Sequence, residues 1–145
     1  MNPRSIGVRA AVAVLMLTAA HAALGDAAGT EPTSTLATKD GGEIYRQICA
    51  GCHMPDARGA VGAGYYPALA ADRALAPKEY AARVVVFGRK NMPAFGAKRA
   101  VGFFYPPVVL SPEQIASVVN YVRSHFGNGY KDGVTAADVA RLDTP

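Results

Sequence analysis

The clearest hydrophobic pattern lies near the C-terminus, where apolar residues recur with a helical period. Ser111 and Gln114 have the spacing of a capping box, and Pro112 between them suits the first helical position. The apolar residues then follow at intervals of three and four: Ile115, Val118, Val119, Val122 and Phe126. The pattern predicts an amphipathic helix that ends at Gly127.

Weaker helical signals occur earlier and later in the chain. Asp40 is a predicted N-cap for a helix over 41–50, and a second helix is predicted over 78–87, closed by Gly88. The segment 135–142 predicts one or two further turns. No β-alternation longer than a few residues and no internal repeat occur. The predicted fold class is therefore all-α, with three to four helices.

Long segments rich in glycine and proline separate these helices. They cover residues 55–69 and 89–107. Three modest helices make a poor hydrophobic core, and long structureless loops are uncommon in a small domain. The loops are therefore expected to wrap around a large apolar cofactor that completes the core.

The first 22 residues have the pattern of a secretory signal peptide. A short polar leader with Arg4 and Arg9 precedes a charge-free apolar run over 10–20 and a small-x-small site ending at Ala22. The run is too short to span a bilayer. Cleavage after Ala27 remains an alternative. The pattern predicts export to a bacterial periplasm, with no transmembrane span left after cleavage.

The remainder of the chain is expected to form one domain. Residues 23–39 are predicted to be a flexible lead-in, residues 40–127 the folded domain, and residues 128–145 a C-terminal tail. The net charge of +4 includes two arginines of the leader. The other basic residues are scattered along the chain, which argues against nucleic-acid binding.

Both cysteines of the chain lie in the sequence CAGCH, as Cys49 and Cys52, followed directly by His53. Cys-x-x-Cys-His is the attachment signature of c-type haem. Two thiols about one helical turn apart can form thioethers with the two vinyl groups of one porphyrin. The adjacent histidine can then bind the iron. The motif predicts one covalently bound haem c, anchored by Cys49 and Cys52, with His53 as the proximal ligand.

Three other interpretations of the two cysteines are open. A redox dithiol of the thioredoxin type requires a βαβ context, which the sequence lacks. A structural zinc site needs four ligands, and beyond the leader His125 is the remaining candidate of the right type. A short-loop disulfide is the third alternative.

The sixth iron ligand can be argued by elimination. Beyond the leader the chain has two methionines, and Met54 directly follows the proximal histidine, so it cannot readily cross the haem. Met92 lies on a loop flanked by glycine and proline that can cover the distal face. His125, expected on the polar side of the last helix, and Lys90 are weaker candidates. Met92 is the predicted distal ligand, and Met54 is predicted only to pack.

The sequence resembles the class I cytochromes c over about residues 40–127. The shared patterns are G-x-x-x-Y-x-x-x-C-x-x-C-H from Gly41 to His53, P-x-L at 67–69, N-M-P at 91–93, and the last helix. The resemblance implies a cytochrome c fold in which Tyr45, Pro67 and Leu69 contribute to the haem pocket. It also implies that the carbonyl of Pro67 accepts a hydrogen bond from the proximal histidine. Gly41 would permit the first and last helices to cross closely.

In detail, residues 52–69 look most like cytochrome subunits that serve periplasmic dehydrogenases of alcohols, sugars or organic acids. The chain departs from minimal members of the family by an aromatic insertion at 103–107 and by the tail after Gly127. Either segment is a candidate docking surface. The alternative is that they cover the haem edge or pack on the helices.

These features predict a one-electron carrier rather than an enzyme, with a dehydrogenase as donor and a cytochrome or oxidase as acceptor. Alternatives are a haem subunit fixed in such a complex, and an open-site haem enzyme or gas sensor. Four basic residues flank the Met92 loop and are a candidate docking rim: Arg89, Lys90, Lys98 and Arg99.

Overall fold

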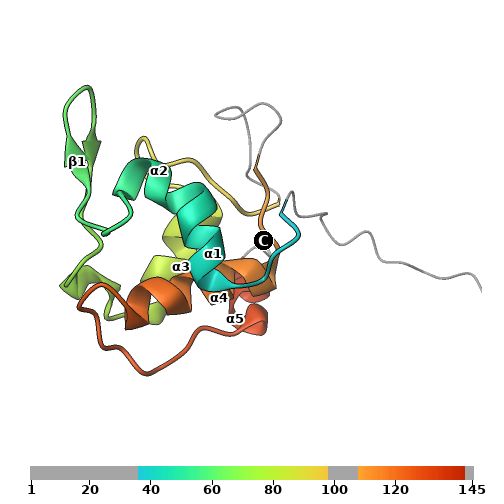
Figure 1. The fold of residues 1–145 in the computed structure, drawn as a ribbon. Coiled ribbons are helices and arrows are strands. Elements are labelled where there is room, and N and C mark those ends of the chain that lie inside the picture. Colours follow the sequence, from blue (N-terminus) through green and yellow to red (C-terminus); the bar gives the residue numbers. More distant parts are fainter. Residues whose placement is uncertain (1–35, 98–107, 143–145) are drawn as a thin grey trace, which may run out of the picture.

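The computed structural model describes residues 36–97 and 108–142. The leader, most of the lead-in, the insertion at 103–107, and Lys98 and Arg99 lie outside these residues. In chain order the elements are α1 (Gly41–Ile44), η1 (Tyr45–Cys49), α2 (Ala50–His53), β1 (Ala60–Val61), β2 (Tyr65–Tyr66), η2 (Arg73–Leu75), α3 (Lys78–Phe87), α4 (Pro112–Ser124) and α5 (Ala136–Leu142). The described part is mostly helical, as predicted (Figure 1).

The first three elements form one continuous helical run. Asp40 caps it by accepting a 2.7 Å hydrogen bond from the backbone N–H of Glu43. In the middle the run widens into a π-helix, η1, before it returns to α-helix in α2. Inserted π-turns often mark functional sites. The helix was predicted to end at residue 50, whereas it continues through the whole Cys-x-x-Cys-His motif.

Helix α4 has the predicted start and the predicted buried stripe. The Ser111 hydroxyl accepts from the N–H of Gln114, and the Gln114 side chain accepts from the N–H of Ser111. The apolar residues of its inner face are buried: Ile115, Ala116, Val118, Val119 and Val122. Gln114 also donates to the carbonyls of Leu36 and Thr38, so it ties down the chain that leads into α1. The helix ends at Ser124, three residues earlier than predicted.

Helices α1 and α4 cross at Gly41, as the resemblance implied. A Cβ atom at this position would lie 2.3 Å from the carbonyl oxygen of Ser117. No side chain fits there unless one helix moves. Ile44 and Tyr45 of the first helical run lie in the same hydrophobic core as Val118 and Val119 of α4. Figure 1 shows α1 next to α4.

Replacement of Gly41 by alanine is therefore expected to destabilise the fold strongly. The clash is with backbone, so the cost should reach about 3 kcal/mol, the upper end of the range for overpacking. Gly51 is the matched control, because a Cβ there has no neighbour within 4 Å and the residue is helical. Gly51→Ala should stabilise by roughly 0.5–1 kcal/mol. Denaturant unfolding measures the stability of both variants. Equal changes in the free energy of unfolding would contradict a close helix crossing at Gly41.

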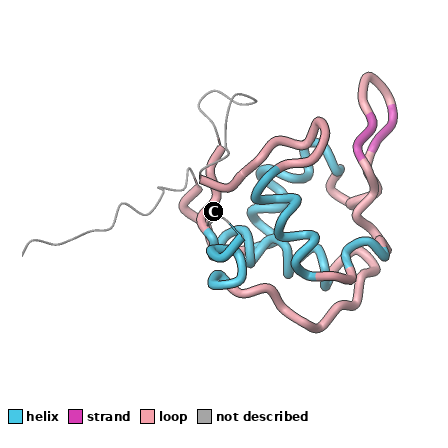
Figure 2. Tube along the Cα trace, turned by 180° about the vertical axis from the view of Figure 1, so that it is seen from behind, coloured by secondary structure: helices cyan, strands magenta, loops and turns pink. Residues whose placement is uncertain are grey.

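Helix α3 has the predicted bounds, and its inner side buries Ala81, Ala82 and Val86. The prediction that residues 55–69 form only a loop was wrong in one respect, because the segment contains an antiparallel hairpin of β1 and β2. Two-residue strands have no alternation that a sequence pattern can detect. The hairpin stands away from the helices in both views (Figures 1 and 2).

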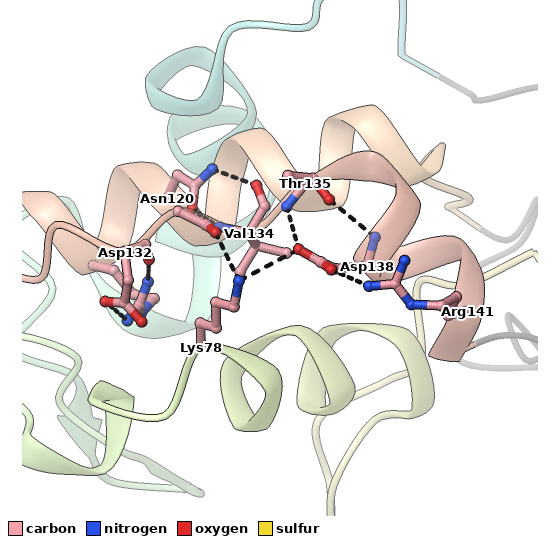
Figure 3. A network of polar contacts seen from close by, with 9 residues as sticks. Lys78, Asn120, Asp132, Val134, Thr135, Asp138 and Arg141 are labelled. Carbon is pink, nitrogen blue, oxygen red and sulfur yellow. Dashed lines mark hydrogen bonds and ion pairs between the residues drawn. The ribbon is translucent and has the colours of Figure 1, made fainter.

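The tail packs on the helices. It runs from the end of α4 to α5, which contacts α3 and α4 and buries Val139. Asn120 holds it by bonding the N–H and the carbonyl of Val134 at 2.8 Å each. Lys78 donates to the carbonyl of Gly133 at 3.2 Å and pairs with Asp138 at 3.5 Å (Figure 3). The predicted short helix over 135–142 is confirmed as α5.

Docking of the tail should weaken in acid. The N–H and side chain of Thr135, followed by the charges of Lys78 and Arg141, lower the pKa of Asp138 to about 2. An unfolded aspartate has a pKa of about 4. Because the pKa of Asp138 is lower in the folded than in the unfolded protein, its ionised carboxylate stabilises the folded protein above pH 4. This stabilisation is lost as the pH falls from about 4 to about 2. The melting temperatures of wild type and Asp138→Asn should converge over this interval. A constant difference down to pH 2 would refute the assignment.

Candidate haem site

The Cys-x-x-Cys-His motif lies on the last two turns of the first helical run. Cys49 ends η1, and Cys52 and His53 lie in α2. Both thiols are free in the structure and only partly buried. The helix thus holds two unpaired thiols three residues apart, beside a histidine, as covalent attachment to a porphyrin requires.

The imidazole of His53 is buried and oriented. The residue is only 7% exposed, and Nδ1 lies 2.9 Å from the carbonyl oxygen of Pro67. Since a carbonyl can only accept, Nδ1 carries the proton of this hydrogen bond, and in a neutral imidazole the lone pair then lies on Nε2. No group in the described part of the chain hydrogen-bonds Nε2. A buried nitrogen with a free lone pair and a fixed tautomer is suited to bind a metal.

A tight loop after His53 brings Pro67 to the imidazole. Met54, Ala57 and Gly59 all have positive φ angles, of 66°, 60° and 68°. Gly59 donates to the carbonyl of His53 at 3.0 Å, and a Cβ on it would lie 2.2 Å from the carbonyl oxygen of Tyr66. The chain therefore turns back at Gly59, and β2 leads directly into Pro67.

Tyr45 lies behind this loop. The residue is 1% exposed, and its hydroxyl donates a 2.8 Å hydrogen bond to the carbonyl of Met54. Burial, together with the neighbouring Cys49, raises the pKa of Tyr45 to about 12, so the group stays a donor. Its ring packs on Phe126, with centroids 4.9 Å apart, and on Tyr121 at 5.9 Å. Tyr45 thus joins the residue after His53 to the end of α4.

Met92 is fixed by a tight turn after α3. Arg89 and Met92 exchange two backbone hydrogen bonds, of 3.0 and 3.1 Å, around Lys90, which has a φ of 53°. The Met92 side chain is half-buried and packs against the core, as does that of Leu69.

Of the other candidate ligands, Lys90 is exposed. His125 is also exposed, and its ring stacks on Tyr121 with centroids 4.1 Å apart.

The Cys49 thiol lacks the lowered pKa that is typical of a redox dithiol. Burial is the main cause that raises the pKa of Cys49 to about 12, and the neighbouring Cys52 adds to it. Reactive cysteines of dithiol enzymes instead have lowered pKa values, because the thiolate is the nucleophile. Among the described residues, no three His, Cys, Asp or Glu side chains are grouped so that they could hold a metal ion. The donor set of two thiols and one oriented imidazole fits haem c.

Comparison with known proteins agrees with this geometry. Residues 36–102 match the family described as cytochrome c oxidase, cbb3-type, subunit III. The chain is 34% identical to cytochrome c-552 of Thermus thermophilus over 117 residues, which cover 74% of this chain and 76% of that protein. The chain belongs to the cytochrome c family. A covalently bound haem c and the cytochrome c fold follow from this membership.

Two further relatives of this cytochrome c are subunits of larger proteins. It is 36% identical to the fructose dehydrogenase cytochrome subunit of Gluconobacter japonicus, over 63% of this chain and 19% of that one. It is 32% identical to the gluconate 2-dehydrogenase cytochrome c subunit of Pantoea cypripedii, over 72% and 24%. The chain therefore spans about a fifth to a quarter of the length of these subunits. In the described part of the chain, no helix is long and apolar enough to cross a bilayer.

Proposed function

We propose that this cytochrome c is a one-electron carrier in which Cys49 and Cys52 hold the haem and His53 and Met92 bind its iron. The observation that carries the proposal is the buried imidazole of His53, whose Nδ1–H bonds the Pro67 carbonyl and whose Nε2 has no hydrogen-bond partner among the described residues. When bound, haem c supplies an iron centre that exchanges one electron between the ferric and ferrous states.

The chain's own residues would hold the iron ligands in place during this electron exchange. The Pro67 carbonyl fixes the tautomer and orientation of His53, and the Tyr45 hydroxyl ties down the turn that follows it. A thioether such as that of Met92 favours the ferrous form and raises the potential. If His53 and Met92 both bind the iron, no substrate would need to reach it, and the protein would not be an enzyme. An open-site enzyme or gas sensor would need Met92 unbound.

The partners would be redox proteins of the bacterial periplasm, reached through the signal peptide at 1–22. The relatives named as dehydrogenase cytochrome subunits support a dehydrogenase as the electron donor. The carrier either diffuses between donor and acceptor or stays fixed in such a complex, and co-purification from native membranes and periplasm distinguishes the two. Arg89 and Lys90 are exposed beside Met92 and form the described part of the docking rim. Association through this rim should weaken with ionic strength.

The visible spectrum tests the proposal. The protein is produced with haem-maturation machinery and titrated with a one-electron reductant such as ascorbate. A sharp α band of reduced haem c that appears and disappears reversibly, with no binding of carbon monoxide, is expected from a carrier with two side-chain ligands. A colourless protein would refute haem attachment, and ready binding of carbon monoxide would favour the open-site alternative.

A further inference from the structure

The segment that carries the Pro67 carbonyl is held by residues that follow the last long helix. We call residues 67–72 the proximal strap. The N–H of Ala71 donates to the carbonyl of Phe126 at 3.0 Å, and the hydroxyl of Tyr130 donates to the carbonyl of Asp72 at 3.1 Å. The strap therefore lies against the start of the tail.

Asn128 makes the central connection. Its side-chain nitrogen donates to the carbonyls of Leu69 at 2.8 Å and Val122 at 2.9 Å, and its oxygen accepts from the N–H of Asp72 at 3.0 Å. The residue is only 9% exposed, so these bonds form out of water. One buried amide thus joins two points of the proximal strap to the last turns of α4.

The other edge of the strap is fixed by the loop after His53. The N–H groups of Leu69 and Ala70 both donate to the carbonyl of Ala57, at 2.8 and 3.0 Å. Leu69 is thus bonded on both sides, by its N–H to Ala57 and by its carbonyl to Asn128. Each residue has only two soft backbone dihedrals, so a fixed Leu69 leaves the Pro67 carbonyl, two residues earlier, little freedom.

We propose that Asn128 is a positioning residue for the iron ligand: by holding the proximal strap, it keeps the Pro67 carbonyl against Nδ1–H of His53. The inference rests on the proposed function. A short Nδ1–H···O=C bond makes the imidazole a better electron donor to iron, which favours the ferric state. Release of the strap lengthens this bond, so the reduction potential should rise. The tail would then influence the reduction potential of the haem from outside the haem pocket.

The test compares Asn128→Ala with Asn120→Ala in the haem-loaded protein. Asn120 also joins α4 to the tail, but its side-chain amide bonds Val134 rather than the strap. Both variants should lose thermal stability. Asn128→Ala alone should raise the potential, by about 30 mV for a threefold change in the ferric-to-ferrous ratio. A potential that moves equally in both variants, or in neither, would overturn the proposal.

Tyr130→Phe provides a second, milder variant in case Asn128→Ala does not fold. It removes one bond to the strap and keeps the ring, which packs beside the Arg123 guanidinium. NMR of the reduced protein with ¹⁵N-labelled histidine reports solvent exchange of the His53 Nδ1 proton. Exchange should be faster in Tyr130→Phe and unchanged in Asn120→Ala. If the exchange rate of the His53 Nδ1 proton is unchanged in both Tyr130→Phe and Asn120→Ala, the positioning role is refuted. If the wild-type protein shows no haem c spectrum, the proposed function is refuted instead.

Discussion

Replacement of both Cys49 and Cys52 by serine is expected to give a colourless, largely unfolded protein. The two thioethers are predicted to be the covalent links to the haem, and serine cannot form them. Haem staining after denaturing electrophoresis and the mass of the intact protein measure the outcome. The mass of the double variant should equal that of the polypeptide alone.

The single variants are the controls for this experiment. Cys49→Ser and Cys52→Ser each leave one thiol and His53, so each should retain some haem through one thioether. A double variant that still carries haem on a denaturing gel would show that the attachment lies elsewhere. A double variant that loses haem but unfolds with the wild-type transition would show that the helices need no cofactor in their core.

The expected unfolding follows from the small size of the protein core. Its apolar members are spread over several helices: Ile44 from α1, Val86 from α3, Ile115 and Val119 from α4, and Val139 from α5. The first helical run extends only from Gly41 to His53 and α5 has seven residues, and isolated helices of these lengths are marginal or unstable in water. A porphyrin anchored on the first helical run would add the missing apolar area.

Local rules in the sequence predicted the helices well. Ser111, Pro112 and Gln114 determine where α4 begins, and Gly88 determines where α3 ends, because capping depends on neighbours a few residues away. Val118 and Val122 were predicted on the buried face for the same reason, since a helical period is a local property. The motif of His53 was equally local, so the candidate proximal side could be predicted from sequence.

Contacts between distant segments could not be predicted in this way. Asn128 follows Gly127 and reads as a turn residue, yet its side chain binds a segment 59 residues earlier in the chain. Met54 and Ala57 adopt positive φ angles that neither residue type favours, because the bonds to Tyr45 and to the strap compensate for the strain. The hydrogen bond from His53 to Pro67 was expected only from the family resemblance.

Replacement of Met92 by leucine is expected to lower the reduction potential by roughly 0.2 V or more, within the range of about 0.8 V over which axial ligands set haem potentials. Leucine has nearly the same volume, so the half-buried site between α3 and the core should stay filled. The substitution removes the sulfur of the proposed iron ligand, and a thioether ligand favours the ferrous state. The weak near-infrared band of a ferric iron–sulfur bond should disappear with it.

Met54→Leu is the matched control, because Met54 follows His53 directly and is predicted only to pack. Its hydrogen bond to Tyr45 uses the backbone carbonyl, so the substitution leaves that contact in place. The potential and the near-infrared band of this variant should match those of the wild type. If Met54→Leu instead loses the band while Met92→Leu retains it, the distal ligand is misassigned. If both variants keep the band, neither methionine is required for it, and the turn from Arg89 to Met92 serves only to pack the loop against α3.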